Sequence, residues 1–197
     1  MKKILVFGAG RSAYYCIKYL LQLEVEKQWQ ITIADGEPLN IRACNEAFPG
    51  ANTKIINVLD GESRQNLIKG QDVVVSLLPA MFHVFIAKDC LEFGVHLVTP
   101  SYISKEMDML NHEAISKKIT MLNELGLDPG IDHISTMNII NRIKSEGGKI
   151  ISYKSYCGGV MSKASNDNPW GYKIVWNPYN IVRAGQDGGM GDRKSVV

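Results

Sequence analysis

Short apolar runs alternate with longer amphipathic stretches through the first 122 residues, and this alternation restricts the fold more than any other feature. The runs predict strands at 4–7, 31–34, 54–58, 72–78, 96–99 and 119–122. Between them the spacing predicts helices from the first turn to about 23, from 61 to 68, from 82 to 93 and from 105 to 118. Repeated strand–helix units of this kind predict an α/β fold with a Rossmann-type, doubly wound parallel sheet.

The first predicted strand is followed by a glycine-rich turn, Gly8-x-Gly10-x-x-Ala13, whose spacing is typical of a dinucleotide site. The first glycine permits a tight turn, the second lets a pyrophosphate approach the backbone, and Ala13 allows close helix–strand packing. Asp35 ends the second strand, where an acid accepts hydrogen bonds from the adenosine ribose and repels a 2′-phosphate. This favours NAD over NADP, although Arg11 in the turn could accommodate the phosphate. The alternative is a turn that binds nothing.

A second concentration of polar groups lies at 123–133, after the sixth predicted strand and before a helix expected at about 134–146. Asp128, Asp132 and His133 therefore fall at the carboxyl end of a strand, where open α/β sheets bind ligands. Asp128 is a candidate for acid–base or electrostatic catalysis, and the alternative is a helix cap. No third ligand stands at metal spacing, so Asp132 is expected to cap and His133 to be structural, without a metal site.

Composition excludes other classes of function. The net charge is +2 with no run of Lys and Arg, which gives no case for nucleic acid or anionic membrane. No apolar stretch approaches the ~20 residues of a membrane span, and the N-terminal apolar run breaks at Gly8, unlike a signal peptide. The four cysteines lack paired metal spacing, so we expect a reduced, cytoplasmic setting.

The rhythm of the sequence changes near residue 125. A predicted strand at 149–155 has loosely alternating apolar positions, and a region rich in Gly, Asn and Pro follows at 157–178. We therefore expect a dinucleotide-binding domain at 1–124 and the incomplete start of an α+β substrate domain at 125–197.

Five motifs resemble the saccharopine dehydrogenase family, in its glutamate-forming branch. They are Leu125-Gly-Leu-Asp-Pro-Gly-Ile-Asp-His133, Ser155-Tyr-Cys-Gly-Gly159, Asp167-Asn-Pro-Trp-Gly-Tyr172, Ser76-Leu-Leu-Pro79 with His83, and Val98-Thr-Pro-Ser-Tyr102. The resemblance extends from Lys3 to about Gln186. It implies an oxidoreductase of lysine metabolism that interconverts saccharopine with glutamate and 2-aminoadipate 6-semialdehyde, acting on a CH–NH bond with a nicotinamide cofactor. It also implies a homodimer built through the substrate domain.

The resemblance implies catalytic roles for Asp128, Tyr102 and Cys157, with Asp128 as the anion that stabilises an iminium charge or moves protons. The cofactor-binding residues would be Gly8, Gly10, Arg11, Ser12, Ala13, Asp35, Asp60, Ser76, Leu77, Leu78, Leu127, Asp128 and Pro129. The substrate-binding residues would be Ser101, Tyr102, Asp128, Cys157 and Gly158. Alternatives are an interface aromatic for Tyr102 and an inert, buried thiol for Cys157. His83 is expected either near the nicotinamide or as a structural histidine.

The chain also departs from the family, whose members are much longer. Residues 192–197 do not resemble the family, and one back-translation of them matches a common sequencing adapter, so we expect this segment to be non-native and the chain to be an inactive fragment. Two other functions stay open. A carboxynorspermidine or homospermidine synthase would share the first domain and the imine chemistry, and a non-catalytic dinucleotide-binding module would keep only Gly8, Gly10 and Asp35.

Overall fold

The computed structural model describes residues 1–156, 161–171 and 173. The chain divides into two compact units, Met1–Asp132 and His133–Val197. The first unit carries the sheet, and the second contains most of one long helix.

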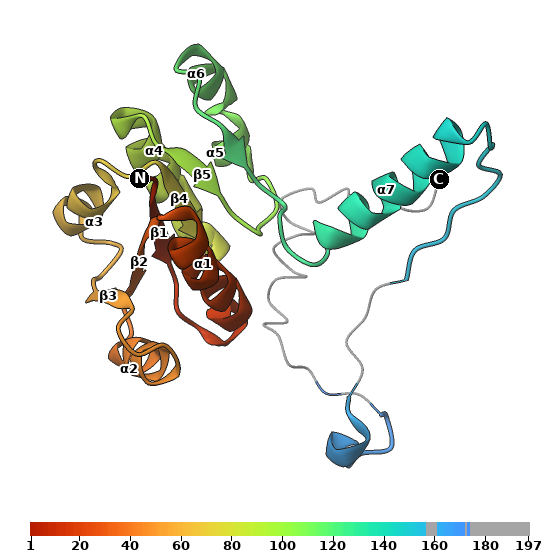
Figure 1. Cartoon of the computed structure of the whole chain (residues 1–197), viewed down its shortest axis with the longest axis horizontal. Helices are drawn as coiled ribbons and strands as arrows, with labels where there is room; N and C mark the ends of the chain where they lie inside the picture. Colours follow the sequence, from red (N-terminus) through yellow and green to blue (C-terminus); the bar gives the residue numbers. More distant parts are fainter. Residues whose placement is uncertain (157–160, 172, 174–197) are drawn as a thin grey trace. The chain divides into compact units, whose positions relative to one another are not determined.

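Six parallel strands form the sheet of the first unit, in the order β3-β2-β1-β4-β5-β6 (Figure 1). The strands are β1 (Lys3–Phe7), β2 (Gln30–Asp35), β3 (Asn52–Ile55), β4 (Val73–Ser76), β5 (His96–Val98) and β6 (Met121–Leu122). β2 and β4 lie on either side of β1, so the strand order reverses at the glycine-rich turn. The predicted doubly wound parallel sheet is therefore confirmed, and its switch point lies at β1 and β4.

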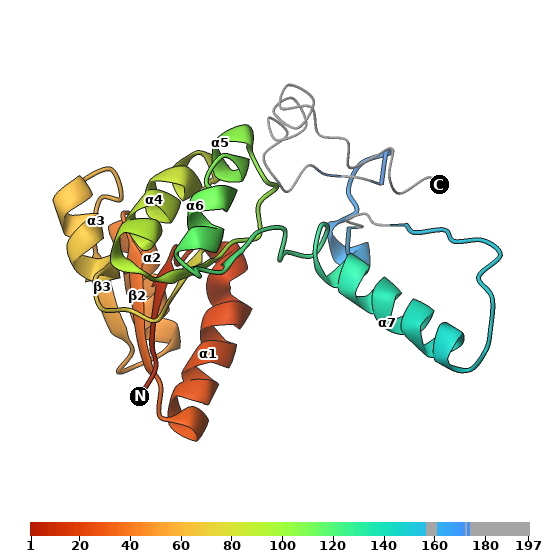
Figure 2. The same cartoon turned by 90° about the horizontal axis from the view of Figure 1, so that it is seen from above.

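Helices cover both faces of this sheet. They are α1 (Tyr14–Lys27), α2 (Pro38–Ala47), α3 (Gly61–Ile68), α4 (His83–Phe93), α5 (Lys105–Asp108) and α6 (Asn111–Ser116), with 3-10 turns η1 (Arg11–Ala13) and η2 (Ala80–Phe82). Figure 2 shows α1 on one side of the strands and α3 and α4 on the other. This arrangement gives the sheet two apolar faces to bury.

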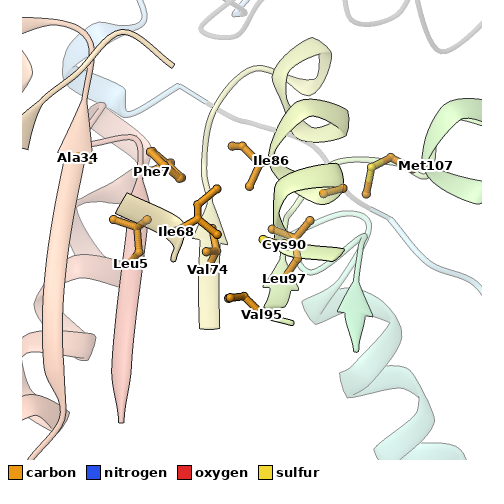
Figure 3. Close-up of a cluster of buried hydrophobic side chains, with 11 residues drawn as sticks. Leu5, Phe7, Ala34, Ile68, Val74, Ile86, Cys90, Val95, Leu97 and Met107 are labelled. Atoms are coloured by element: carbon orange, nitrogen blue, oxygen red, sulfur yellow. The ribbon is translucent and has the colours of Figure 1, made fainter. Parts of the chain in front are cut away.

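The core consists of two clusters, because alternate residues of β1 point to opposite faces. Leu5 and Phe7 pack with side chains of β4, β5, α3 and α4, among them Ile86 of α4 (Figure 3). Ile4 and Val6 pack on the other face with side chains of β2, α1 and α2. A strand that is buried on both faces reads as a continuous apolar run, which explains the sequence pattern of 4–7.

Two elements near β3 differ from the prediction. Helix α2 was not predicted; Pro38 is at its start and the Glu37 side chain accepts a hydrogen bond from the backbone N–H of Leu39. The third strand was predicted at 54–58 but ends at Ile55. Beyond it the Asn57 side chain accepts the N–H of Leu59, which turns the apolar residues Ile56 and Val58 inward against the first cluster.

Two later predictions were wrong. The helix expected at 105–118 is divided into α5 and α6, because the N–H of Leu110 bonds the carbonyl of Met107 in a tighter turn between them. No strand forms at 149–155; those residues are described and irregular, and most are exposed. The described regular structure after Gly130 is instead helix α7 (Ile131–Ser145) and a 3-10 turn η3 (Lys163–Ser165). Within the residues that the structure describes, no helix combines the length and apolar character needed to cross a membrane.

Candidate functional site

The glycine-rich turn joins β1 to η1 and meets the segment that follows β4. Gly8 has φ +102°, and a Cβ atom there would lie 3.1 Å from the backbone of Leu77, so both conformation and space require glycine. A Cβ at Gly10 would meet no protein atom within 4 Å, which leaves the backbone open to approach. Ala13 is 1% exposed and packs in the second cluster with Ile17 of α1. The turn thus has the local geometry that a dinucleotide fingerprint needs.

Asp35 ends β2 and is only 8% exposed. Its Oδ2 atom accepts hydrogen bonds from the N–H of Ala9 (2.7 Å) and from the amide of Asn40 (3.2 Å), and its Oδ1 atom accepts the N–H of Glu37 (2.7 Å). The carboxylate therefore organises the turn after β1 and the start of α2. It still places a negative charge at the end of β2, as the sequence predicted.

Three other predicted cofactor residues lie on η1 and at the start of α3. Arg11 and Ser12 are exposed on η1, one turn before α1. Asp60 is the N-cap of α3, and its carboxylate accepts the hydroxyl of Ser63 at 2.6 Å and the N–H of the same residue. The hydroxyl hydrogen bond is the main reason that the pKa of Asp60 lies below its ordinary value. The structure therefore gives Asp60 a capping role, and its predicted contact with the cofactor stays a prediction.

A buried hydrogen-bond network lies at the carboxyl ends of β4 and β5. The ring of His83, at the start of α4, bonds the hydroxyl of Ser76 through Nδ1 at 2.9 Å. Its Nε2 atom bonds the hydroxyls of Thr99 at 2.9 Å and of Ser101 at 2.8 Å. Burial lowers the pKa of His83 to about 4, so the ring is neutral at neutral pH. Thr99 was not among the predicted site residues, although it is a polar residue at a strand end.

Backbone hydrogen bonds join the loop after β5 to the loop after β6. The N–H of Glu124 donates to the carbonyl of Ser101 at 3.0 Å, and the N–H of Leu125 donates to the carbonyl of Thr99 at 3.2 Å. The side chain of Glu124 also accepts the N–H of Ile103 at 3.4 Å. The structure thereby brings together the segments that hold the predicted residues Ser101, Tyr102 and Asp128. Glu124 was not predicted as a site residue, and its positive φ of 60° is not visible in the sequence.

Asp128 lies at the tip of a closed loop before α7. The N–H of Gly126 donates to the carbonyl of Pro129 at 2.9 Å, and the N–H of Ile131 donates back to the carbonyl of Gly126 at 3.0 Å. Gly130 has φ +144°, and a Cβ there would overlap the backbone of Gly126. The side chain of Asp132, in the first turn of α7, accepts the N–H of Gly130 at 2.8 Å. This bond fixes the residue before the helix, and the predicted role of Asp132 as a cap stays a prediction.

The two predicted catalytic residues that the structure describes are both exposed. The Asp128 carboxylate is exposed, and among the described residues it makes no hydrogen bond and does not cap α7. Tyr102 is 55% exposed and Leu127 is 68% exposed. Cys157 and Gly158 lie outside the described residues. A cluster of three or more potential metal ligands is also absent from the described part of the chain.

Two saccharopine dehydrogenase family models match most of this chain. The model described as the saccharopine dehydrogenase NADP binding domain matches residues 4–122, and the model described as the saccharopine dehydrogenase C-terminal domain matches residues 126–193. The two matches meet near residue 124, beside the loop that holds Asp128.

Individual relatives agree with the family models. The chain is 39% identical over 201 residues to alpha-aminoadipic semialdehyde synthase of Arabidopsis thaliana, covering 93% of this chain and 19% of that protein. It is 34% identical to the saccharopine dehydrogenase (NADP(+), L-glutamate-forming) of Saccharomyces cerevisiae, covering 93% of this chain and 40% of that enzyme.

A solved structure gives the same result. The apo, histidine-tagged saccharopine dehydrogenase (L-Glu forming) from Saccharomyces cerevisiae superposes with a TM-score of 0.78 and 33% identity, over 93% of this chain and 40% of that one. The chain thus spans less than half the length of the relatives it matches. With one domain model over more than half of its residues and a second over most of the rest, the chain belongs to the saccharopine dehydrogenase family.

Proposed function

We propose that the chain is part of a nicotinamide-dependent saccharopine dehydrogenase that interconverts saccharopine with L-glutamate and 2-aminoadipate 6-semialdehyde. The unpaired carboxylate of Asp128 is the observation that best supports this proposal. It stands on a loop whose base is bonded to the loop of Ser101 and Tyr102, at the edge where doubly wound sheets bind ligands. A residue that served only as a helix cap would have its oxygen atoms engaged at the start of α7.

The chemistry assigns a task to each side chain. When bound, the cofactor exchanges a hydride with the carbon of an imine, and the substrate nitrogen carries positive charge as the bond changes. Asp128 lowers the energy of that charge and can exchange a proton with the nitrogen or with attacking water. Tyr102 and Ser101 orient the substrate through their hydroxyl groups. We propose the same contact role for Cys157 and Gly158, and cofactor contacts for Leu77, Leu78 and Pro129.

For the cofactor we propose NADP, and NAD is the alternative that Asp35 favours. The family model and the yeast relative are both named for NADP, and Arg11 is exposed in the turn, where it can pair with a 2′-phosphate. The carboxylate of Asp35 already accepts hydrogen bonds from backbone N–H groups, which weakens the argument that it binds the ribose hydroxyl groups. Titration of the chain with NADH and NADPH tests the choice, with Arg11→Gln and the exposed Arg42→Gln as matched variants. Tighter binding of NADH that Arg11→Gln leaves unchanged would favour NAD.

The function is tested by cofactor reduction in the full-length product of the gene, with saccharopine as substrate and with carboxynorspermidine in parallel. We expect the enzyme to turn over saccharopine and not the polyamine compound. In Asp128→Asn the shape remains and the charge is lost, so kcat should fall by roughly 10²-fold or more. The exposed Asp108→Asn serves as the control. Wild-type turnover in Asp128→Asn would assign this residue to structure, and activity with the polyamine precursors would replace the proposed substrate.

We further propose a homodimer formed through the substrate domain and a cytoplasmic location. The location is supported by Cys16, Cys44 and Cys90, which the structure describes as free thiols. We also propose that the dinucleotide-binding domain ends at residue 124 and the substrate domain begins at residue 125, because the sequence pattern changes there. Sedimentation of the full-length product tests the dimer, and a concentration-independent monomer would contradict it.

A further inference from the structure

The imidazole ring of His83 contacts both sides of the proposed site. The residue is 2% exposed at the start of α4, and three hydroxyl groups surround its ring. One of them, Ser76, ends β4 in the segment proposed to border the cofactor. The others, Thr99 and Ser101, follow β5 in the segment proposed to bind substrate. A satisfied core histidine needs two partners, whereas this ring has three, drawn from two functional segments.

The tautomer of the His83 ring decides which of its three hydroxyl partners donate and which accept. A neutral imidazole has one N–H donor and one acceptor nitrogen. The hydroxyl oxygen of Thr99 also accepts the N–H of Ser101 at 3.4 Å. In the tautomer in which Nδ1–H donates to Ser76, the single lone pair of Nε2 is shared by the Ser101 hydroxyl at 2.8 Å and the Thr99 hydroxyl at 2.9 Å. A Ser101 hydroxyl that donates to Nε2 keeps its own lone pairs to offer to a ligand.

We propose that His83, as its Nδ1–H tautomer, is a positioning residue that orients Ser101 as a hydrogen-bond acceptor for an N–H group of the substrate and anchors Ser76 beside the cofactor. The proposal rests on the proposed dehydrogenase function. An acceptor at Ser101 suits the amino groups of an amino-acid substrate and disfavours a carboxylate at that position. Coupling through one ring also fixes the proposed cofactor-binding segment and the proposed substrate-binding segment relative to one another.

Two isosteric substitutions separate the two halves of this role. An asparagine amide reaches the position of Nδ1 and keeps the contact with Ser76 alone, whereas a glutamine amide reaches that of Nε2 and keeps the contacts with Thr99 and Ser101. In the full-length product, His83→Asn should raise the KM for saccharopine about fivefold to tenfold, the scale of one lost hydrogen bond, and leave the Kd of the dinucleotide unchanged. His83→Gln should weaken dinucleotide binding and leave that KM unchanged. The exposed His112→Gln is the control.

A purely structural histidine would give equal changes in KM and Kd in both variants, and that result would overturn the proposal. A wild-type protein that binds dinucleotide but does not oxidise saccharopine would instead overturn the proposed function, and this inference with it. If neither variant folds, ¹⁵N NMR of the wild-type chain decides. The Nδ1–H tautomer at His83 supports the proposal, and the Nε2–H tautomer overturns it.

Discussion

At the scale of single residues, burial makes His83 a pH-dependent element of stability. Its folded-state pKa is about 4, below the ordinary value of 6.5, because burial disfavours the charged ring. Between those values the unfolded chain binds more protons than the folded one, so the free energy of unfolding falls as the pH is lowered through this range. We expect a loss of about 2 kcal/mol between pH 7 and pH 5 from this residue.

Urea denaturation at the two pH values measures this loss. His83→Gln should remove most of the pH dependence, and the exposed His112→Gln should retain it. If the free energy of unfolding falls equally between pH 7 and pH 5 in wild type and in His83→Gln, the His83 ring titrates normally in the folded chain.

Asn123 is a second residue whose environment predicts a measurable effect. Its Oδ1 atom is buried without a hydrogen-bond partner among the described residues, directly after β6. A buried, unsatisfied polar group costs about 1–3 kcal/mol, so Asn123→Leu should raise the free energy of unfolding by about 1 kcal/mol. Thermal denaturation of the chain measures it, with the exposed Asn111→Leu as the control. A loss of stability in Asn123→Leu would reveal that Asn123 holds an ordered water or ligand.

At the scale of elements, the loop of Asp128 depends on one glycine. Gly130 has φ +144° and has no room for a Cβ atom, whereas Gly50 has φ +90° and open space around its Cβ position. Gly130→Ala should therefore cost clearly more unfolding free energy than Gly50→Ala, which carries only a conformational penalty of order 1 kcal/mol. Chemical denaturation of both variants provides the comparison. Equal losses would mean that the loop relaxes to accept the methyl group.

The elements also show how far the sequence alone could lead. The strands of the sheet were predictable because they are buried on both faces and read as apolar runs, as Val74 and Leu97 illustrate. Helix α2 was missed because only Ile41 and Cys44 of its ten residues are buried, too few to give a clear periodicity. The strand at 149–155 was predicted from loose alternation, yet Ile151 is 95% exposed, so no packing supports that pattern in the described residues.

The site was predictable in part, for a similar reason. Asp35 and Asp128 could be named as candidates because an acid at or after a strand end is visible in the sequence. The hydrogen bonds of Thr99 and Glu124 could not be predicted, because they depend on loops that meet only in the folded chain. Asp35 shows the limit most clearly, since its carboxylate bonds protein groups that the sequence cannot place beside it.

At the scale of the whole molecule, the first unit contains all of the residues that we propose to bind the dinucleotide. Both apolar clusters, the glycine-rich turn, Asp35 and the loop up to Asp132 lie within Met1–Asp132. Helix α7, in contrast, buries none of its residues. We therefore expect a shortened chain of residues 1–132 to fold and to bind dinucleotide with the same Kd as the 197-residue chain.

Circular dichroism and fluorescence titration of the two chains test this expectation. The matched control is Gly8→Val in both chains, which should abolish binding because the new side chain meets Leu77. A shortened chain that folds but binds more than about tenfold more weakly, a difference of 1.4 kcal/mol, would place a binding contribution after residue 132.

The two outer strands of the sheet have a consequence for assembly. β6 has two residues, and β3 presents the polar, mostly exposed segment Asn52–Ile55 with Lys54 at its centre. A short strand offers few backbone groups for pairing, and a lysine on an outer strand opposes the approach of a second chain. Growth of the sheet by addition of strands from a neighbouring molecule is therefore disfavoured at both ends. The homodimer that we propose is therefore expected to form through helices or through the second unit, which would keep the sheet of the proposed nucleotide site separate from the contact that joins the subunits.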